Sequence, residues 1–395
     1  MTRRERAVAS ALFAVAVLLA ALPGCKPSAP RAFPEQPTVR EKNALPVGIL
    51  LPLSGAQASF GADAARGIEL AAQEINAQGG VLGRPFRVEV RDTRSDESAT
   101  VEAVKEFAAQ ASMPLIIGEI ASSRSRAAAQ EAQARGIPLL APAATQQDLT
   151  AVGDWIFRSC YADPFPGVAM AKFASSLQAT RAAVLEEVGS AYSKELTENF
   201  IEQYQQDGGT LVVRETFQPG DAHLRERLET IKAANPDVIF LPSYYSAAAE
   251  VIRAARQLGI ETPFLGGDGW DSPEFLSQAG ADAKNCYFAN HFSADNPTVE
   301  NKAFIAAFTE KYGTPPPPLA ALAYDATRLA AAALNAAQST DRAAVRDALA
   351  ATRDFPGVTG TISYEGGRTP RKPAIILSIQ DGQFRYLETV PPNAN

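Results

Sequence analysis

The stretch Leu45–Leu51, LPVGILL, carries no charged side chain and is apolar along its whole length. A short continuous apolar run predicts a strand that is buried on both faces, which is typical of a parallel sheet covered by helices. Apolar residues then recur at helical spacing, and the pair Gly79-Gly80 ends that pattern. The positions that make up the helical face are Ala64, Ile68, Ala72 and Ile75.

The same alternation of strand and helix continues along the chain in two separate series. The first series has further strands predicted at 86–90, 115–118 and 136–140, and the second has strands at 183–185, 211–213, 238–241 and 264–266. Alternating strands and helices predict parallel, doubly wound sheets. A body of about 350 residues is too long for a single core. We therefore predict an α/β fold with two Rossmann-like lobes.

The C-terminal third changes character and is mainly helical, with helices predicted at 299–312, 319–337 and 342–352. The tail, 375–387, is predicted to form a β-hairpin around Asp381-Gly382. We expect the additional helices to cover the first lobe, so that the chain crosses between the lobes more than once. The predicted division is 46–158 plus 289–356 for lobe 1, and 159–288 plus 357–390 for lobe 2.

The N-terminus predicts export. Residues 1–6 include three arginines, and 7–22 contain no charge, a pattern typical of a signal peptide and too short for a membrane span. We predict a signal peptide at 1–24. Leu22-Pro23-Gly24-Cys25 resembles the bacterial lipobox, which predicts lipidation of Cys25 and a flexible, proline-containing tether over 25–45. The alternative is an ordinary signal peptide followed by a coincidental cysteine.

Composition excludes several classes of function. The net charge of −7 and the pI near 5.2 argue against a nucleic-acid-binding protein. Two histidines and three cysteines, with no Cys-x-x-Cys spacing, do not indicate a metal site. Catalytic and nucleotide-binding motifs such as Gly-x-Ser-x-Gly, the Walker loop and Gly-x-Gly-x-x-Gly are absent from the sequence. We therefore predict a protein that is not an enzyme and needs no cofactor.

Four segments together resemble a known family, and the similarity extends over about 46–387. They are 47–61 (VGILLPLSGAQASFG), 75–83 (INAQGGVLG), 118–123 and 136–145 (GIPLLAPAAT). They are similar to type I periplasmic binding proteins, and within these to the branched-chain amino-acid-binding branch of ABC import systems. The resemblance implies two lobes joined by three hinge crossings, which close on a small amino-acid-like solute.

The resemblance also implies partners and a location. The protein would be an exported, lipid-anchored monomer at the periplasmic or cell surface that delivers its ligand to an ABC permease. Other possibilities remain open: a sensor that signals to a membrane partner, a structural surface lipoprotein, or a binder of a non-amino-acid solute such as an amide or an aromatic acid.

Candidate ligand-binding residues follow the predicted strands, because open α/β sheets bind ligands beyond the carboxyl ends of their strands. Ser122 and Ser123 begin a helix, whose N-terminus favours a carboxylate; the alternative is that they only cap this helix. Ala143 and Thr145 follow the next strand, and the resemblance implies backbone and hydroxyl contacts to the ligand there.

In the second lobe, Asp268 lies between glycines directly after a predicted strand. The resemblance implies that an acidic residue here pairs with the ligand ammonium, while the alternative is an ordinary turn aspartate. Tyr192, Tyr244 or its neighbour Tyr245, and Phe60 match positions that enclose the ligand, although each is also compatible with simple packing.

Cys160 and Cys286 both lie beside predicted hinge segments, at 158–163 and 286–291. The resemblance implies that hinge strands run side by side, so a disulfide between these cysteines is a hypothesis. The alternative is two small buried hydrophobic residues.

Overall fold

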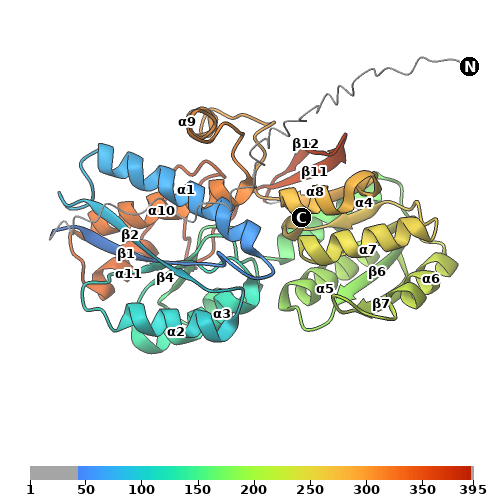
Figure 1. The fold of residues 1–395 in the computed structure, drawn as a ribbon, viewed down its shortest axis with the longest axis horizontal. Helices are drawn as coiled ribbons and strands as arrows, with labels where there is room; N and C mark the ends of the chain where they lie inside the picture. Colours follow the sequence, from blue (N-terminus) through green and yellow to red (C-terminus); the bar gives the residue numbers. More distant parts are fainter. Residues whose placement is uncertain (1–42, 393–395) are drawn as a thin grey trace, which may run out of the picture.

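The computed structural model describes residues 43–392. The predicted signal peptide, the lipidation site Cys25 and nearly all of the tether lie outside the described residues. Within the described range, no helix is long and apolar enough to cross a membrane. The chain forms two α/β lobes, which lie side by side in Figure 1.

The first lobe is built on a five-stranded sheet in the order β2-β1-β3-β4-β5, in which every pairing is parallel. As predicted, every residue of β1 is buried, because helices cover both faces of the sheet. The strands are β1 (Leu45–Leu51), β2 (Phe86–Asp92), β3 (Ile116–Ile117), β4 (Leu139–Ala141) and β5 (Ile156–Arg158). The helices that connect them are α1 (Ala58–Ala77), α2 (Glu97–Ala108), α3 (Ser122–Arg135) and the 3-10 helix η1 (Gln147–Val152).

Helices from the C-terminal third pack on this lobe, as the sequence argument expected. They are α9 (Lys302–Tyr312), α10 (Pro318–Ala337) and α11 (Arg342–Ala350). Helix α10 lies along α1 (Figure 1). A Cβ atom at Gly67 of α1 would stand 2.0 Å from the carbonyl oxygen of Ala320, so only glycine permits this approach. The Tyr312 hydroxyl donates to the Arg66 carbonyl at 3.0 Å, which fixes α9 to the same helix.

The second lobe is built on a seven-stranded sheet in the order β12-β11-β10-β9-β8-β6-β7. Its strands are β6 (Arg181–Glu187), β7 (Thr210–Phe217), β8 (Val238–Phe240), β9 (Phe264–Gly266), β10 (Cys286–Asn290), β11 (Ala374–Gln380) and β12 (Gln383–Val390). Strands β6 to β10 pair in parallel, and β11 and β12 form the predicted antiparallel hairpin. Asp381 and Gly382 both have positive φ, as a two-residue hairpin turn requires.

The helices of the second lobe are α4 (Pro164–Ser176), α5 (Ala191–Gln206), α6 (Leu224–Ala234), α7 (Tyr245–Gln257) and α8 (Pro273–Ala279), with the 3-10 helices η2 (Asp268–Trp270) and η3 (Gly280–Ala283). The sequence does not predict β5, α4, α8 or β10. Residues 286–291 are predicted as a hinge segment, whereas β10 pairs with both β9 and β11.

The chain passes between the lobes three times: after β5, after β10 and before β11. The exact division of the chain into lobes remains a prediction. The Arg158 backbone N–H donates to the Arg368 carbonyl, and the Tyr364 hydroxyl donates to the Arg158 carbonyl. These contacts with the end of β5 favour a third crossing near Lys372, later than the predicted position of 357.

The disulfide hypothesis is wrong, because Cys160 and Cys286 are both free and buried. Cys286 begins β10, whereas the crossing follows the other end of that strand at Asn290. Four steps at about 3.3 Å separate the two ends by roughly 13 Å. The two cysteines are small buried residues: the Cys160 thiol lies 3.4 Å from the Ala144 carbonyl, and the Cys286 thiol lies 3.6 Å from the Lys284 carbonyl.

Candidate ligand-binding site between the lobes

The ends of parallel strands bring the candidate residues to the interface between the lobes. Several hydrogen bonds join the lobes directly, including the following three. Tyr245 Oη donates to the Ala56 carbonyl at 2.8 Å, Ser59 Oγ lies 3.0 Å from Ser272 Oγ, and the Gln147 backbone N–H donates to Glu195 at 2.9 Å. The two lobes are therefore in direct contact in this structure.

Ser122 is the first residue of α3 and is buried, but it does not cap the helix. The N-cap residue is Ala121, and it makes no side-chain cap hydrogen bond. The interpretation of Ser122 and Ser123 as simple N-caps is therefore wrong. Ser122 Oγ instead accepts a bond from the Gln146 backbone N–H at 3.4 Å. Burial raises the pKa of Tyr244, and a hydrogen bond from the Ser122 backbone N–H partly opposes this shift. The Tyr244 hydroxyl of the second lobe therefore lies beside the start of α3.

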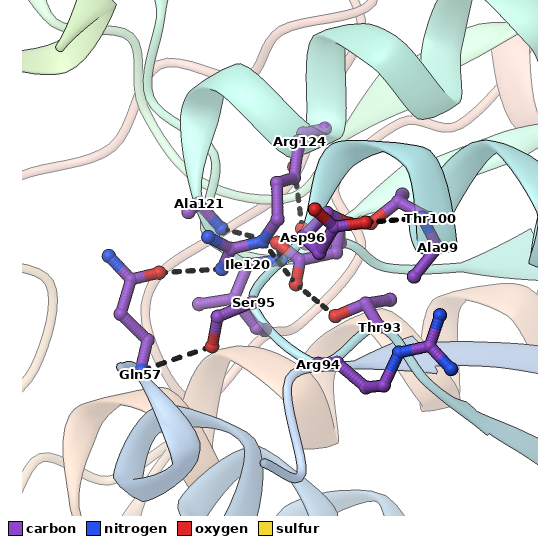
Figure 2. Close-up of polar contacts among 12 residues, drawn as sticks. Gln57, Thr93, Arg94, Ser95, Asp96, Ala99, Thr100, Ile120, Ala121 and Arg124 are labelled. Atoms are coloured by element: carbon purple, nitrogen blue, oxygen red, sulfur yellow. Dashed lines mark hydrogen bonds and ion pairs between the residues drawn. The ribbon is translucent and has the colours of Figure 1, made fainter. Parts of the chain in front are cut away.

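A buried ion pair that the sequence reading missed fixes this helix start (Figure 2). Both oxygens of Glu119 are fully used. Oε2 accepts from the backbone N–H groups of Ile120 and Ala121, at 2.7 and 2.8 Å. Oε1 accepts from Thr93 Oγ1 at 2.8 Å and from Arg124 Nε at 3.0 Å.

Arg124 extends this network to the loop before α1. Its Nη2 donates to Gln57 Oε1 at 2.5 Å, and Figure 2 shows these two side chains pointing toward each other. Gln57 in turn donates its backbone N–H to Ser95 Oγ at 3.1 Å. The loops that follow β1, β2 and β3 are thus joined, and Ser122 sits on a rigid support.

A second buried cation shapes the loop that carries Thr145. The Arg158 guanidinium donates to four successive carbonyls at 2.5 to 3.1 Å, those of residues 144–147. Ala143, Ala144 and Thr145 are all buried in this loop. The bonds from Arg158 curve this loop and hold Thr145 next to the first crossing between the lobes. There the Thr145 carbonyl accepts a hydrogen bond from the Asp163 backbone N–H at 2.7 Å.

In the second lobe, Asp268 begins η2 and is held by two neighbours. Its Oδ1 accepts from the Tyr192 hydroxyl at 3.0 Å, and its Oδ2 lies 3.2 Å from His291 Nε2. Burial lowers the pKa of His291, and the Asp268 carboxylate only partly opposes this shift. At neutral pH the imidazole is therefore neutral, and the contact assigns its proton to Nε2.

The predicted aromatic residues form a continuous wall beside Asp268. The rings of Tyr192 and Tyr244 stack with centroids 5.0 Å apart. Phe60, from α1 in the first lobe, meets Tyr244 edge-on at 6.1 Å and Tyr245 at 5.0 Å. Five of the eight predicted residues, Ser122, Tyr192, Tyr244, Asp268 and Phe60, are linked by these contacts, and Thr145 precedes Gln146, whose backbone N–H bonds Ser122. Ala143 is buried two positions from Thr145, and Ser123 is only partly buried.

The sequence reading did not single out Tyr161 and Asp163, which lie in the first crossing. The Tyr161 ring stacks on His291 at 3.8 Å. Burial raises the pKa of Tyr161, and the negative charges of Asp268 and Asp163 raise it further, so these groups are close together. The sequence could have indicated both residues, because they lie in the predicted hinge segment 158–163 and polar residues in a hinge face the space between two lobes.

The model for the family described as periplasmic binding protein matches residues 44–383. The chain belongs to the periplasmic binding protein family. Within that family it is of the Leu/Ile/Val-binding type. Leu/Ile/Val-binding protein homolog 3 of Brucella melitensis is 26% identical over 347 residues, which cover 87% of this chain and 93% of that protein.

Solved structures of similar proteins agree with this assignment. The leucine-binding protein LivK of Thermotoga maritima is 32% identical with a TM-score of 0.84, over 89% of this chain and 100% of that one. LivJ of Streptococcus pneumoniae, solved in complex with isoleucine, is 32% identical with a TM-score of 0.83 over the same shares. The predicted family and α/β fold class are confirmed.

As a periplasmic binding protein of this type, the chain is an exported solute-binding protein and not an enzyme. Among residues 43–392, no group of three or more His, Cys, Asp or Glu side chains is arranged to hold a metal ion. The chemistry of the site is that of recognition: backbone and hydroxyl donors in the first lobe, and a buried carboxylate with aromatic rings in the second.

Proposed function

We propose that this protein captures an amino acid between its lobes and delivers it to an ABC permease. The ligand carboxylate would bind the Ser122 backbone N–H and the Thr145 hydroxyl, and the ligand ammonium would bind Asp268. Phe60, Tyr192 and Tyr244 would enclose the ligand, with Ala143 and Ser123 at its edge.

The observation that carries this proposal is the position of Asp268. Its carboxylate is mostly buried at the interface, and its neighbours are a phenol hydroxyl and a neutral imidazole, neither of which neutralises its charge. Across the interface, the start of α3 favours an anion. A zwitterion supplies both charges at once. Charge-assisted hydrogen bonds in a site closed to water are stronger than those at a surface.

We further propose an order of events in which the ligand binds one lobe before the lobes close. The first lobe carries the rigid helix start and the Arg158-shaped loop, so it would bind the ligand first. Closure would then bring Asp268 and the tyrosines onto the ligand, and the bonds from Tyr245 to Ala56 and from Ser59 to Ser272 would hold the closed form. The relatives LivK and LivJ, described as leucine-binding and isoleucine-bound, support an amino acid as the ligand.

Lipid anchoring through Cys25 is part of the same proposal and rests on the lipobox-like sequence alone. Mass spectrometry of protein purified from membranes tests it. The N-terminal peptide of the mature protein should begin at a diacylated Cys25, and Cys25→Ser should release the protein into the soluble fraction. An unmodified peptide that begins elsewhere would contradict the anchor without affecting the binding proposal.

A thermal-shift screen of the mature protein tests the ligand class. The compounds would be the amino acids, their deaminated acids, amides and aromatic acids. A ligand that binds only the folded protein stabilises it by about 2.7 kcal/mol at a hundred times its Kd. The proposal expects stabilisation by α-amino acids and none by the deaminated acid of the best ligand. Stabilisation only by compounds without an amine would overturn the role of Asp268.

A further inference from the structure

Asp163 is a buried carboxyl group that lies beside Thr145 and Glu195, but its oxygens make no hydrogen bond of normal geometry with any described residue. It precedes α4 in the N-cap position, yet its side chain makes no cap hydrogen bond. The residue is 0% exposed, and neither Oδ1 nor Oδ2 has a hydrogen-bond partner among the described residues. A buried acceptor that is left without a well-aligned donor destabilises the fold.

The neighbours of Asp163 place it at the interface between the lobes. Burial raises the pKa of Asp163 well above the ordinary value, a hydrogen bond from the Thr145 hydroxyl partly opposes this shift, and the charges of Asp268 and Glu195 add to it. The Glu195 side chain is also close enough to bond Asp163; burial raises the pKa of Glu195, and this bond partly opposes that shift. Thr145 belongs to the first lobe, and Glu195 and Asp268 belong to the second. The charge of Asp163 also raises the pKa values of Tyr161, Tyr192 and Tyr244, whose main cause is burial. Asp163 is therefore adjacent to the same residues that surround the proposed ligand.

The buried cations nearby are already engaged. The terminal nitrogens of Arg158 bond the carbonyls of residues 144–147, although its charge still lowers the pKa of Asp163 slightly. Lys372 donates to the Ser159 carbonyl at 3.1 Å and to Thr359, and its Nζ lies 3.8 Å from Asp325. Arg124 is held by Glu119 and Gln57.

Tyr161 is a second buried polar side chain at the interface that lacks a hydrogen-bond partner among the described residues. Its ring lies flat on His291. A buried phenol hydroxyl normally finds a hydrogen-bond partner. This part of the interface therefore contains several buried polar atoms without a hydrogen-bond partner among the described residues: the Asp163 oxygens and the Tyr161 hydroxyl, and also His291 Nδ1, Gln146 Oε1 and Arg158 Nε.

We propose that Asp163 accepts a hydrogen bond from the side chain of the ligand, so that the substrates are amino acids whose side chains carry an amide or amine N–H. This inference rests on the proposed function and narrows its substrate class. A ligand ammonium satisfies Asp268 but leaves Asp163 without a donor. An aliphatic side chain would leave both Asp163 and Tyr161 unpaired in a closed site, and sites built to bond a polar group reject analogues that lack it.

Isothermal titration calorimetry with matched ligand pairs tests the inference. Asparagine and leucine have nearly the same shape, as do lysine and norleucine, but only the first of each pair has a side-chain N–H donor. We expect the wild-type protein to bind at least one donor ligand at least tenfold more tightly than its aliphatic partner. In Asp163→Ala this ratio should fall to near one.

Asp154→Ala is the matched control, because Asp154 is exposed in the first lobe and away from the site; it should keep the wild-type ratio. Asp163→Asn distinguishes the two donors: the amide preference should survive in it and the amine preference should not. If Asp163→Ala does not fold, the wild-type ratios alone decide.

The outcomes separate the two proposals. Equal or tighter binding of leucine and norleucine by the wild-type protein would overturn the inference and leave the amino-acid function intact. An unchanged ratio in a folded Asp163→Ala protein would also overturn it. Failure of every amino acid to bind would overturn the proposed function itself.

Discussion

The Tyr192 hydroxyl donates a hydrogen bond to Asp268 Oδ1 at 3.0 Å and accepts one from the Gly269 backbone N–H at 3.0 Å. The tyrosine thus fixes the carboxylate relative to the backbone of its own loop. Gly267 and Gly269 both lie against the Tyr192 ring, where a Cβ atom would meet the tyrosine at 2.4 Å and 3.1 Å respectively. The glycines on either side of Asp268 therefore let the aromatic ring approach it.

Tyr192→Phe removes this bond and keeps the ring. Because an ordinary hydrogen bond contributes about 0.5–1.5 kcal/mol, we expect amino-acid affinity to fall roughly three- to tenfold. Titration calorimetry measures the change. Tyr386 of β12 is half-buried, and its hydroxyl lies 3.0 Å from Thr389 Oγ1 of the same strand. It offers the control Tyr386→Phe, which should bind as the wild type does. Equal affinity in Tyr192→Phe would show that Asp268 is positioned without this bond.

Glu119→Gln should destabilise the first lobe. The substitution leaves Arg124 buried without a counter-charge, and breaking one partner of a buried ion pair costs about 3–5 kcal/mol. Urea unfolding followed by circular dichroism measures the loss. Glu106→Gln is the matched control, since Glu106 pairs with Arg91 at the surface, where ion pairs contribute about 0–1 kcal/mol. Similar losses in the two variants would refute the structural role of the buried pair.

The ligand-free protein should become less stable as the pH rises from about 4 to 7. Burial raises the pKa of Asp271 to about 7, although the Asn290 amide opposes this shift. The folded protein holds a proton in this range that the unfolded chain, with a pKa near 3.9, has released. The free energy of unfolding therefore decreases through this window and levels off above it.

Asp271→Asn removes that titration and keeps an acceptor for Asn290. The difference in unfolding free energy between pH 4 and pH 7 should shrink by roughly 3 kcal/mol. Urea unfolding at several pH values in the absence of ligand measures it. A variant with the same pH profile as the wild type would mean that Asp271 is ionised in the folded protein.

Tyr245→Phe removes the bond to the Ala56 carbonyl, which joins the lobes outside the proposed ligand site. The closed form should lose stability by about 1 kcal/mol, so the dissociation rate of the ligand should rise several-fold with little change in the association rate. Stopped-flow fluorescence separates the two rates. Tyr386→Phe again serves as the control. A change confined to the association rate would contradict the role of this bond in holding the closed form.

The repeated alternation of buried strands and amphipathic helices made most of the fold predictable from the sequence. Strand β10 was not recognised, because its five residues include Tyr287 and Asn290 and read as a linker. Helix α4 was missed because it begins Pro164-Phe165-Pro166, although proline is compatible with a first helical turn.

The candidate site was predictable wherever a residue follows a strand, as Ser122, Thr145, Tyr192, Tyr244 and Asp268 do. The groups that support it were not, because their roles depend on tertiary contacts. Glu119 and Gln57 are 62 positions apart, yet both bond Arg124. Asp163 and His291 come from different crossings, and no local pattern indicates that both lie near Asp268.

A crystal structure of the mature protein with its best amino-acid ligand tests the central claim most directly. The account predicts the ligand ammonium within about 3 Å of a carboxylate oxygen of Asp268, and the ligand carboxylate at the Ser122 N–H and the Thr145 hydroxyl. A ligand bound in the reverse orientation, or one whose ammonium does not contact Asp268, would contradict it.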